Sequence, residues 1–224
     1  MNASPARRVA RFHVLTNTAR QQRFSHDELA RRALRGGAGA VQFRQKTGAI
    51  REKLRAARDV AGACAEAEAP LLVNDHLDVA QAVGAAGVHL GQDDFPIAAA
   101  RHVLGADALI GATATTAAQA REAEEAGADY VGFGPVFPTD SKADPASVKG
   151  PEVLRAACRA VSIPVIAIAG VTPERVPTCL GAGAHGVAVL SGVACTADPA
   201  QAARRYRDAL DAALGGSAPS PHAD

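Results

Sequence analysis

The chain of 224 residues contains no long apolar run and no surplus of charge of either sign. No stretch reaches the roughly 18 consecutive apolar residues of a membrane-spanning helix, and residues 1–14 are basic without a long apolar segment. We therefore expect no membrane association and no secretory signal. Lys and Arg total 24 against 23 Asp and Glu, whereas a sequence-nonspecific nucleic-acid binder usually carries a basic surplus. The composition indicates a cytoplasmic protein that does not bind nucleic acid.

The cysteines are few and follow no ligand pattern. No CxxC or Cys/His spacing typical of a metal or redox site links Cys64, Cys158, Cys179 and Cys195. We interpret them as reduced thiols that are mostly packed in the interior. A GxGxxG motif after the first predicted strand is also missing, which argues against a doubly wound dinucleotide-binding sheet.

The chain instead shows a regular alternation of short apolar runs and Ala-rich amphipathic stretches. Eight runs rich in Val, Ile and Leu are bounded by Gly, Pro, Asp or Asn, as is typical of strands buried on both faces. They begin near Arg11, Ala40, Pro70, Gly87, Leu109, Tyr130, Pro164 and Gly186. Helical segments separate them, and several begin at cap residues, namely Ser25, Thr116, Thr172 and Asp198.

Eight β-then-α units in 224 residues predict a compact (β/α)8 TIM barrel of the α/β class that forms a single domain. We expect the barrel over residues 11–214, an N-terminal tail over residues 1–10 and a disordered C-terminal tail over residues 215–224. In such barrels the functional residues lie at the carboxyl ends of the strands. The polar residues that follow the predicted strands are therefore expected to share one site.

Two carboxylates are expected to meet at that end of the barrel. Asp75 follows the third predicted strand and Asp94 follows the fourth, and adjacent strand ends bring such side chains together. Two close, unpaired negative charges repel each other, and a hard cation such as Mg²⁺ removes the repulsion. We therefore predict a magnesium site at Asp75 and Asp94. The alternatives are a helix N-cap at Asp75 and a turn at Asp93 and Asp94 before Pro96.

Basic side chains follow the second predicted strand. In the stretch VQFRQK, alternation places Gln42, Arg44 and Lys46 on one side of the strand. An Arg presents a planar fork to a phosphate, and a Lys presents a point charge. A solvated strand end is the alternative, although charges so close to a barrel interior usually have partners.

The last three loops contain hydroxyls and glycines. The loop after the sixth predicted strand contains Thr139, Ser141 and Lys142, a combination that suits a phosphate better than a packed interior. Gly170 and Ser191 follow the seventh and eighth strands, where barrels commonly bind a phosphate through backbone N–H groups. These loops predict phosphate binding within the shared site.

Two histidines are given no catalytic role. His89 lies within the fourth predicted strand, where a core histidine whose hydrogen bonds are satisfied fits at least as well as an inward-facing catalytic one. His185 precedes the eighth strand, which places it at the opposite end of the barrel. The sequence therefore offers no His/Asp pair for acid–base chemistry.

With these motifs in view, the chain resembles the thiamine phosphate synthase family over about residues 11–213. The matching motifs are VQFRQK, LLVNDHLDVAQAVGAAGVHLGQDD, IGATATT, FGPVFPTDSK, IPVIAIAGVTPE and VAVLSGV. The resemblance implies a magnesium-dependent transferase of thiamine biosynthesis. It joins 4-amino-2-methyl-5-hydroxymethylpyrimidine diphosphate to 4-methyl-5-hydroxyethylthiazole phosphate and releases pyrophosphate and thiamine phosphate. It also implies a dissociative route through a pyrimidine cation, while homo-oligomer formation stays open.

Carried over onto matching positions, the resemblance implies a role for each polar residue of the site. Asp75 and Asp94 would bind magnesium. The residues that would hold the diphosphate are Gln42, Arg44, Lys46, Asn74 and Lys142, with Thr113 near the pyrimidine. Those at the thiazole phosphate or beside it would be Thr139, Ser141, the Gly170 backbone and Ser191. The implied catalytic residues, which stabilise the departing pyrophosphate, are Arg44, Lys46 and Lys142.

The chain departs from the family pattern at three positions. Gln45 stands where an acidic residue is common, and Ala169 stands where a second glycine is usual. Thr113 replaces a usual Ser, and the His often found two residues later is missing. None of these changes removes a charge that the implied reaction needs.

Three alternative functions fit the same barrel. A related thiazole tautomerase would need a histidine in the fifth loop as its acid or base, and that loop reads GATATT. A lysine-dependent aldolase would use Lys142 as a Schiff-base nucleophile, but Lys142 lies in a hydroxyl-rich loop rather than a desolvated strand. A noncatalytic phosphate-binding regulator is the third, and the intact set of metal and diphosphate residues argues against it.

Overall fold

Eight parallel strands form a closed barrel in the computed structural model, which describes residues 9–139 and 147–215. Each strand pairs with its sequence neighbour, and β1 pairs with β8 to close the sheet. The strands are β1 Phe12–Thr16, β2 Ala40–Phe43, β3 Leu71–Asn74, β4 Gly87–Leu90, β5 Leu109–Ala114, β6 Tyr130–Phe133, β7 Val165–Ile168 and β8 Gly186–Val189. The predicted (β/α)8 barrel is confirmed.

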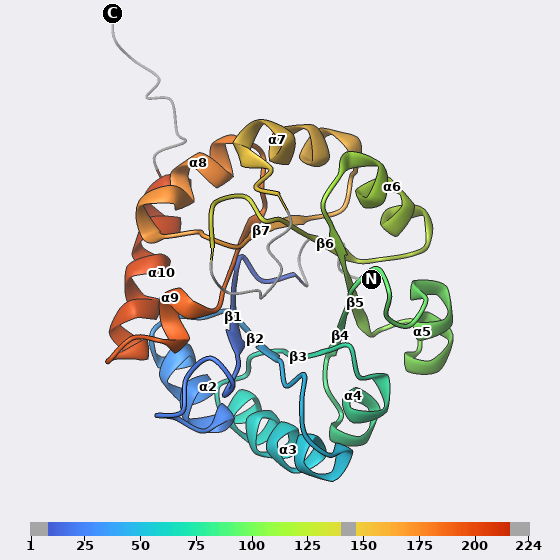
Figure 1. Ribbon diagram of the computed structural model, residues 1–224, viewed down its shortest axis with the longest axis vertical. Coiled ribbons are helices and arrows are strands. Elements are labelled where there is room, and N and C mark those ends of the chain that lie inside the picture. Colours follow the sequence, from blue (N-terminus) through green and yellow to red (C-terminus); the bar gives the residue numbers. More distant parts are fainter. Residues whose placement is uncertain (1–8, 140–146, 216–224) are drawn as a thin grey trace, which may run out of the picture.

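Helices surround the barrel as an outer ring (Figure 1). They are α2 His26–Arg35, α3 Ile50–Glu66, α4 Leu77–Val83, α5 Ile97–Leu104, α6 Ala117–Glu125, α7 Gly150–Ala160, α8 Val176–Gly181, α9 Ser191–Ala194 and α10 Pro199–Gly215, with the 3₁₀ turn η1 Pro173–Arg175. The short helix α9 was not predicted, because four residues carry too little periodicity to be recognised. The segment after Thr172 begins as a 3₁₀ turn rather than as an α-helix. No described helix combines the length and the apolar character needed to cross a membrane.

The predicted helix boundaries have clear local causes. Ser25 and Glu28 form a reciprocal capping box at the start of α2, and Thr116 accepts a hydrogen bond from the Gln119 N–H at the start of α6. Glycines that end helices adopt positive φ angles of 95° at Gly37, 93° at Gly127 and 101° at Gly183. This left-handed conformation favours glycine and turns the chain into the next strand.

The barrel interior is partly polar. Tyr130 is 1% exposed, and a Cβ at position 111 would lie 2.1 Å from its ring. A Cβ at position 132 would lie 2.8 Å from Cε1 of His89. Glycines at 111 and 132 therefore leave the space that these two rings occupy inside the barrel.

The base of the barrel is closed by the first described residues. Val9 is 5% exposed, and its carbonyl accepts a hydrogen bond of 2.9 Å from Nε2 of His185. The carbonyl of Ala10 accepts one of 2.8 Å from Nε2 of the buried His13. His185 thus lies at the end opposite the carboxyl ends of the strands, as predicted. Residues 9 and 10 pack against the barrel, although the predicted N-terminal tail includes them, and most of that tail and of the C-terminal tail lies outside the described residues.

The cysteines are all free thiols. Cys64 and Cys179 are buried, Cys158 is half-buried and Cys195 is exposed. Burial raises the pKa of Cys64 to about 12 and that of Cys179 to about 11, so both thiols stay protonated near neutral pH. The predicted packed role therefore fits three of the four.

Candidate functional site

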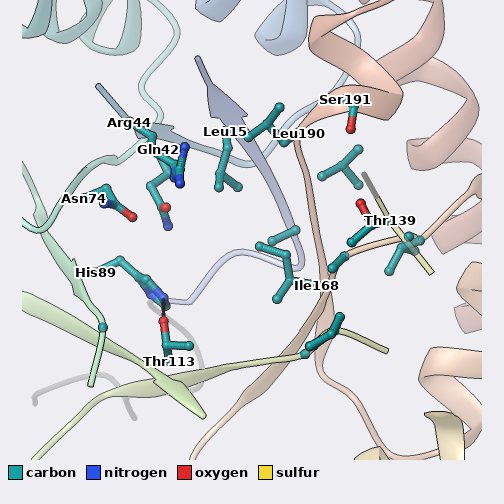
Figure 2. A pocket seen from close by; sticks show the side chains of 18 of the residues that line it. Leu15, Gln42, Arg44, Asn74, His89, Thr113, Thr139, Ile168, Leu190 and Ser191 are labelled. Atoms are coloured by element: carbon teal, nitrogen blue, oxygen red, sulfur yellow. Dashed lines mark hydrogen bonds between the residues drawn. The ribbon is translucent and has the colours of Figure 1, made fainter. Parts of the chain in front are cut away.

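A cavity of about 820 Å³ opens at the carboxyl ends of the strands. Of the twelve residues predicted for the site, ten line it. They are Gln42, Arg44, Lys46, Asn74, Asp75, Asp94, Thr113, Thr139, Gly170 and Ser191. The other two, Ser141 and Lys142, lie outside the described residues. Figure 2 shows the amide and basic side chains of Gln42, Arg44 and Asn74 on one side, facing Thr139 and Ser191 across the cavity.

The carboxylates of Asp75 and Asp94 lie close enough to share a hydrogen bond. Burial and this contact raise the pKa of Asp75, although Lys46, which forms an ion pair with it, opposes the rise. Burial would also raise the pKa of Asp94, but hydrogen bonds from Asp75 and the Gly91 N–H outweigh that effect and lower it. The pKa values of the two neighbouring carboxyl groups are therefore shifted in opposite directions, at a place where a cation could bind.

A divalent cation fits this carboxylate pair by its chemistry. Mg²⁺ is bound in proteins by one or two carboxylates and keeps further positions for water and phosphate oxygens. Within residues 9–139 and 147–215, no group of three or more His, Cys, Asp and Glu side chains gathers into a metal cage. The donor set at Asp75 and Asp94 thus suits a cation whose remaining ligands come from a substrate.

Asp75 is not the helix N-cap that was named as the alternative to a metal ligand. Its φ is 66°, in the left-handed region, and its N–H donates to the His89 carbonyl at 2.9 Å. The N-cap of α4 is His76 instead, without a side-chain cap. The left-handed geometry strains the chain. The turn that was named as the alternative at Asp94 is present in part, because the Asp94 carboxylate accepts a hydrogen bond of 2.6 Å from the Gly91 N–H.

A buried lysine supports the charged end of the cavity. Lys53 on α3 is 7% exposed, and its Nζ donates to Nε2 of His76 at 2.8 Å and to the Lys46 carbonyl at 3.4 Å. It therefore connects the loop that holds Lys46 to the residue next to Asp75. This residue was not predicted, since nothing in the helical pattern of α3 separates it from the exposed arginines around it.

Arg44 and Gln42 point into the cavity from the end of β2 (Figure 2). Burial lowers the pKa of the Arg44 guanidinium, and the charge of Asp75 opposes that effect. An arginine still carries its charge at neutral pH. Gln42 is 4% exposed and hydrogen-bonds Tyr130 below the cavity floor. The alternation that predicted a shared side for these residues is confirmed.

His89 lies at the cavity floor, where its ring is held by two hydroxyls. Its Nε2 is 3.0 Å from Oγ1 of Thr113, and its Nδ1 is 3.0 Å from the Tyr130 hydroxyl. The contact with Thr113 is drawn in Figure 2. The buried-histidine interpretation is therefore correct in part, because the ring is satisfied yet also lines the cavity. It brings an imidazole next to the fifth strand, where the loop itself has none.

The opposite end of the cavity is built from backbone and hydroxyl groups. Gly170 has a φ of 65°, and a Cβ there would lie 2.4 Å from the Pro138 carbonyl oxygen. Ala169, the residue before it, also has a positive φ, 74°. This backbone conformation favours glycine, which explains why a second glycine is usual at position 169. Glycine at 170 is therefore required for the loops after β6 and β7 to touch, next to Ser191 at the start of α9.

Apolar side chains separate the two ends. Leu15, Ile168 and Leu190 project into the cavity between Gln42 and Ser191 (Figure 2). Arg175, which also lines the cavity, was not predicted. Its position in η1, five residues beyond Gly170, shows no strand-end signal in the sequence.

Comparison with known proteins identifies the family. The family model described as thiamine monophosphate synthase matches residues 12–193. A thiamine-phosphate synthase of Salinibacter ruber is 60% identical over 216 residues, which cover 95% of each chain. One of Natronomonas pharaonis is 43% identical over 201 residues, 89% of this chain and 94% of that one.

A solved structure agrees with these sequence matches. The thiamine phosphate pyrophosphorylase of Pyrococcus furiosus superimposes with a TM-score of 0.85 at 37% identity, over 93% of this chain and 99% of that one. A 3-hexulose-6-phosphate synthase superimposes with a TM-score of 0.64 at 19% identity, which shows a shared barrel alone. From the matched family model, the relatives and the cavity together, the chain belongs to the thiamine monophosphate synthase family.

Proposed function

We propose that this chain condenses hydroxymethylpyrimidine diphosphate with thiazole phosphate to give thiamine phosphate and pyrophosphate. The observation that carries the proposal is a single cavity with a carboxylate pair and cations at one end and hydroxyl and backbone groups at the other. The first end suits a metal-bound diphosphate and the second a phosphate monoester. The name of the 60% identical relative, thiamine-phosphate synthase, supports the same reaction.

The first step breaks the bond between the pyrimidine methylene carbon and the diphosphate oxygen. Both electrons of that bond leave with pyrophosphate, so negative charge grows at the end of the cavity that Arg44 and Lys46 line. Cations that are already in position stabilise such charge without reorganisation. Lys142 would add an ammonium group there, and because it lies outside the described residues its role stays a prediction.

Asp75 and Asp94 would hold magnesium at the same end. Burial, together with the close approach of Asp94, raises the pKa of Asp75, and a bound cation would stabilise the charged carboxylate instead. When bound, magnesium supplies positive charge to the diphosphate oxygens. Lys46, which forms an ion pair with Asp75, would add its ammonium charge to the same oxygens.

The second step forms the carbon–nitrogen bond. The thiazole nitrogen donates its lone pair to the pyrimidine methylene cation, and no proton leaves that nitrogen, so no general base is required. Water must be kept from the cation, and Leu15, Ile168 and Leu190 line the middle of the cavity. His89, bonded to Thr113 and Tyr130, is suited to orient the pyrimidine rather than to remove a proton.

A coupling assay tests the proposal. Purified protein would receive both substrates with and without Mg²⁺, and thiamine phosphate would be followed as fluorescent thiochrome. We expect magnesium-dependent product that is lost in Lys142→Ala. The control is Lys149→Ala, which should retain it, because the Nζ of Lys149 donates a hydrogen bond to Ser147. Absence of product from folded, magnesium-supplied protein would contradict the synthase. A tautomerase assay and trapping of an imine with borohydride would then test the alternative reactions.

A further inference from the structure

Arg175 contacts both of the loops that form the hydroxyl and backbone end of the cavity. Its Nη1 donates to the Gly170 carbonyl at 2.6 Å, and its Cζ lies 4.7 Å from the centre of the Phe137 ring. Phe137 belongs to the loop after β6 and Gly170 to the loop after β7. Arg175 also lines the cavity and is half-buried, so it places a cationic side chain at this end.

The two loops fit together closely at the point that Arg175 holds. The Phe137 N–H donates to the Ala169 carbonyl at 3.2 Å, and a Cβ at Gly170 would lie 2.7 Å from the Phe137 carbonyl oxygen. Arg175 adds a hydrogen bond to one loop and a cation–π contact to the other. Its guanidinium is thereby fixed in position next to the cavity rather than extended into solvent.

The positive charges of the cavity are unevenly distributed between its two ends. Among the described residues that line the cavity, the Lys and Arg side chains are Arg44, Lys46 and Arg175. The first two follow β2, and Arg175 alone follows β7. A phosphate monoester carries close to two negative charges at neutral pH, and hydroxyl and backbone groups do not neutralise it. An arginine offers five N–H donors, and the bond to Gly170 uses one of them.

We propose that Arg175 is a specificity-determining residue that supplies the positive charge for the phosphate of the thiazole substrate. This inference deepens the proposed function and depends on it for the identity of the ligand. Arg175 would favour the phosphorylated thiazole over the free alcohol. It would act on binding of this substrate and leave the ionisation of the pyrimidine diphosphate to the opposite end of the cavity.

Three substitutions separate charge from loop support. Arg175→Ala removes both, Arg175→Gln keeps an N–H donor for the Gly170 carbonyl without charge, and Arg175→Lys keeps the charge. We expect KM for thiazole phosphate to rise about 10- to 100-fold in the Ala and Gln variants, as for loss of a hydrogen bond to a charged group. The kcat and the KM for the pyrimidine diphosphate should change less than about 3-fold, and Lys should restore most of the affinity.

The control is Arg205→Ala, which removes an exposed arginine on α10 that pairs with Glu174 outside the cavity. It should leave both KM values unchanged. Thermal unfolding of every variant would show whether the fold is intact. Equal KM changes for both substrates, or a KM for thiazole phosphate unchanged in Arg175→Gln, would overturn the assignment.

Calorimetric binding of thiazole phosphate keeps this test separate from the proposed function. If the wild-type protein forms no product, the synthase proposal fails, yet weaker binding in Arg175→Gln than in the wild type would still support Arg175. Equal affinities, or no binding to the wild type, would overturn the role of Arg175. The unphosphorylated thiazole alcohol should bind wild type and Arg175→Gln alike.

Discussion

The two ends of the cavity provide binding groups of different kinds. The end at β2–β4 carries charged side chains, among them Arg44, Lys46, Asp75 and Asp94, while the end at β6–β8 offers backbone, hydroxyls and one arginine in the described part of the chain. Charge that appears during a reaction is stabilised best by groups already in position. A phosphate whose charge does not change needs binding only. From this difference we expect the β2–β4 end to affect kcat and the β6–β8 end to affect KM.

The largest effect is expected from Asp94→Ala. The substitution removes a carboxylate from the proposed magnesium site and also the acceptor for the Gly91 N–H. We expect kcat/KM to fall by about 10³-fold, in the range found when a group that stabilises developing charge is lost. Thiochrome assays over a range of Mg²⁺ concentrations measure it. Asp78→Ala, at an exposed aspartate of α4, is the control. A loss below 10-fold would contradict the division between the two ends.

Acidification distinguishes the cavity from the base of the barrel. Burial lowers the pKa of His13 to about 4 from 6.5, so its neutral form is favoured in the folded state. The resulting stability is complete above pH 6.5 and is lost as pH falls toward 4, because the unfolded chain takes up the proton first. We expect roughly 3 kcal/mol to be lost over this range. His26, with its pKa lowered chiefly by burial to about 4, adds to the same slope.

Urea unfolding between pH 7 and pH 4 measures this slope. His13→Gln should reduce the pH dependence, and His102→Gln, at an exposed position of α5, should leave it unchanged. If the slope were the same in all three proteins, His13 would not be the group that titrates. If activity is lost at a pH where the protein remains folded, the groups that titrate lie in the cavity rather than at the base of the barrel.

A smaller effect is expected from Arg44→Lys at the charged end. Lysine keeps the charge but replaces the planar fork with a point charge, so one of the paired contacts to a phosphate is lost. We expect kcat to fall by about 30-fold, consistent with the loss of one charge-assisted hydrogen bond. Arg51→Lys, at an exposed position at the start of α3, is the matched control. An effect confined to the KM for thiazole phosphate would reverse the comparison.

The smallest effect is expected from Ser191→Ala at the opposite end. Removing one hydroxyl from a phosphate site costs about 1 kcal/mol, which corresponds to roughly a 5-fold rise in KM for thiazole phosphate. The kcat should stay the same. The control is Ser162→Ala. It removes a hydroxyl before β7 that donates a hydrogen bond to Glu124. A fall in kcat of the size expected for Arg44→Lys would show that both ends take part in the chemistry.

Much of this site could be predicted because of the symmetry of a parallel barrel. All eight strands end at the same face, so a residue needs only to follow a strand to belong to the site. Ten predicted residues line the cavity for this reason. The resemblance to the thiamine phosphate synthase family is confirmed by the matching family model. The magnesium and the individual substrate contacts stay predictions, since they concern groups that bind the chain.

The sequence by itself determined the (β/α)8 fold, because strands buried on both faces need continuous apolar runs and glycines such as Gly37 and Gly127 must end the helices. The tertiary structure alone decided three further features. Strand register places His89 opposite Gly111 and within hydrogen-bonding distance of Thr113, Asp75 adopts a left-handed backbone, and Arg175 turns back to the Gly170 carbonyl. Each depends on side-chain directions and contacts between separate segments, which local periodicity does not encode.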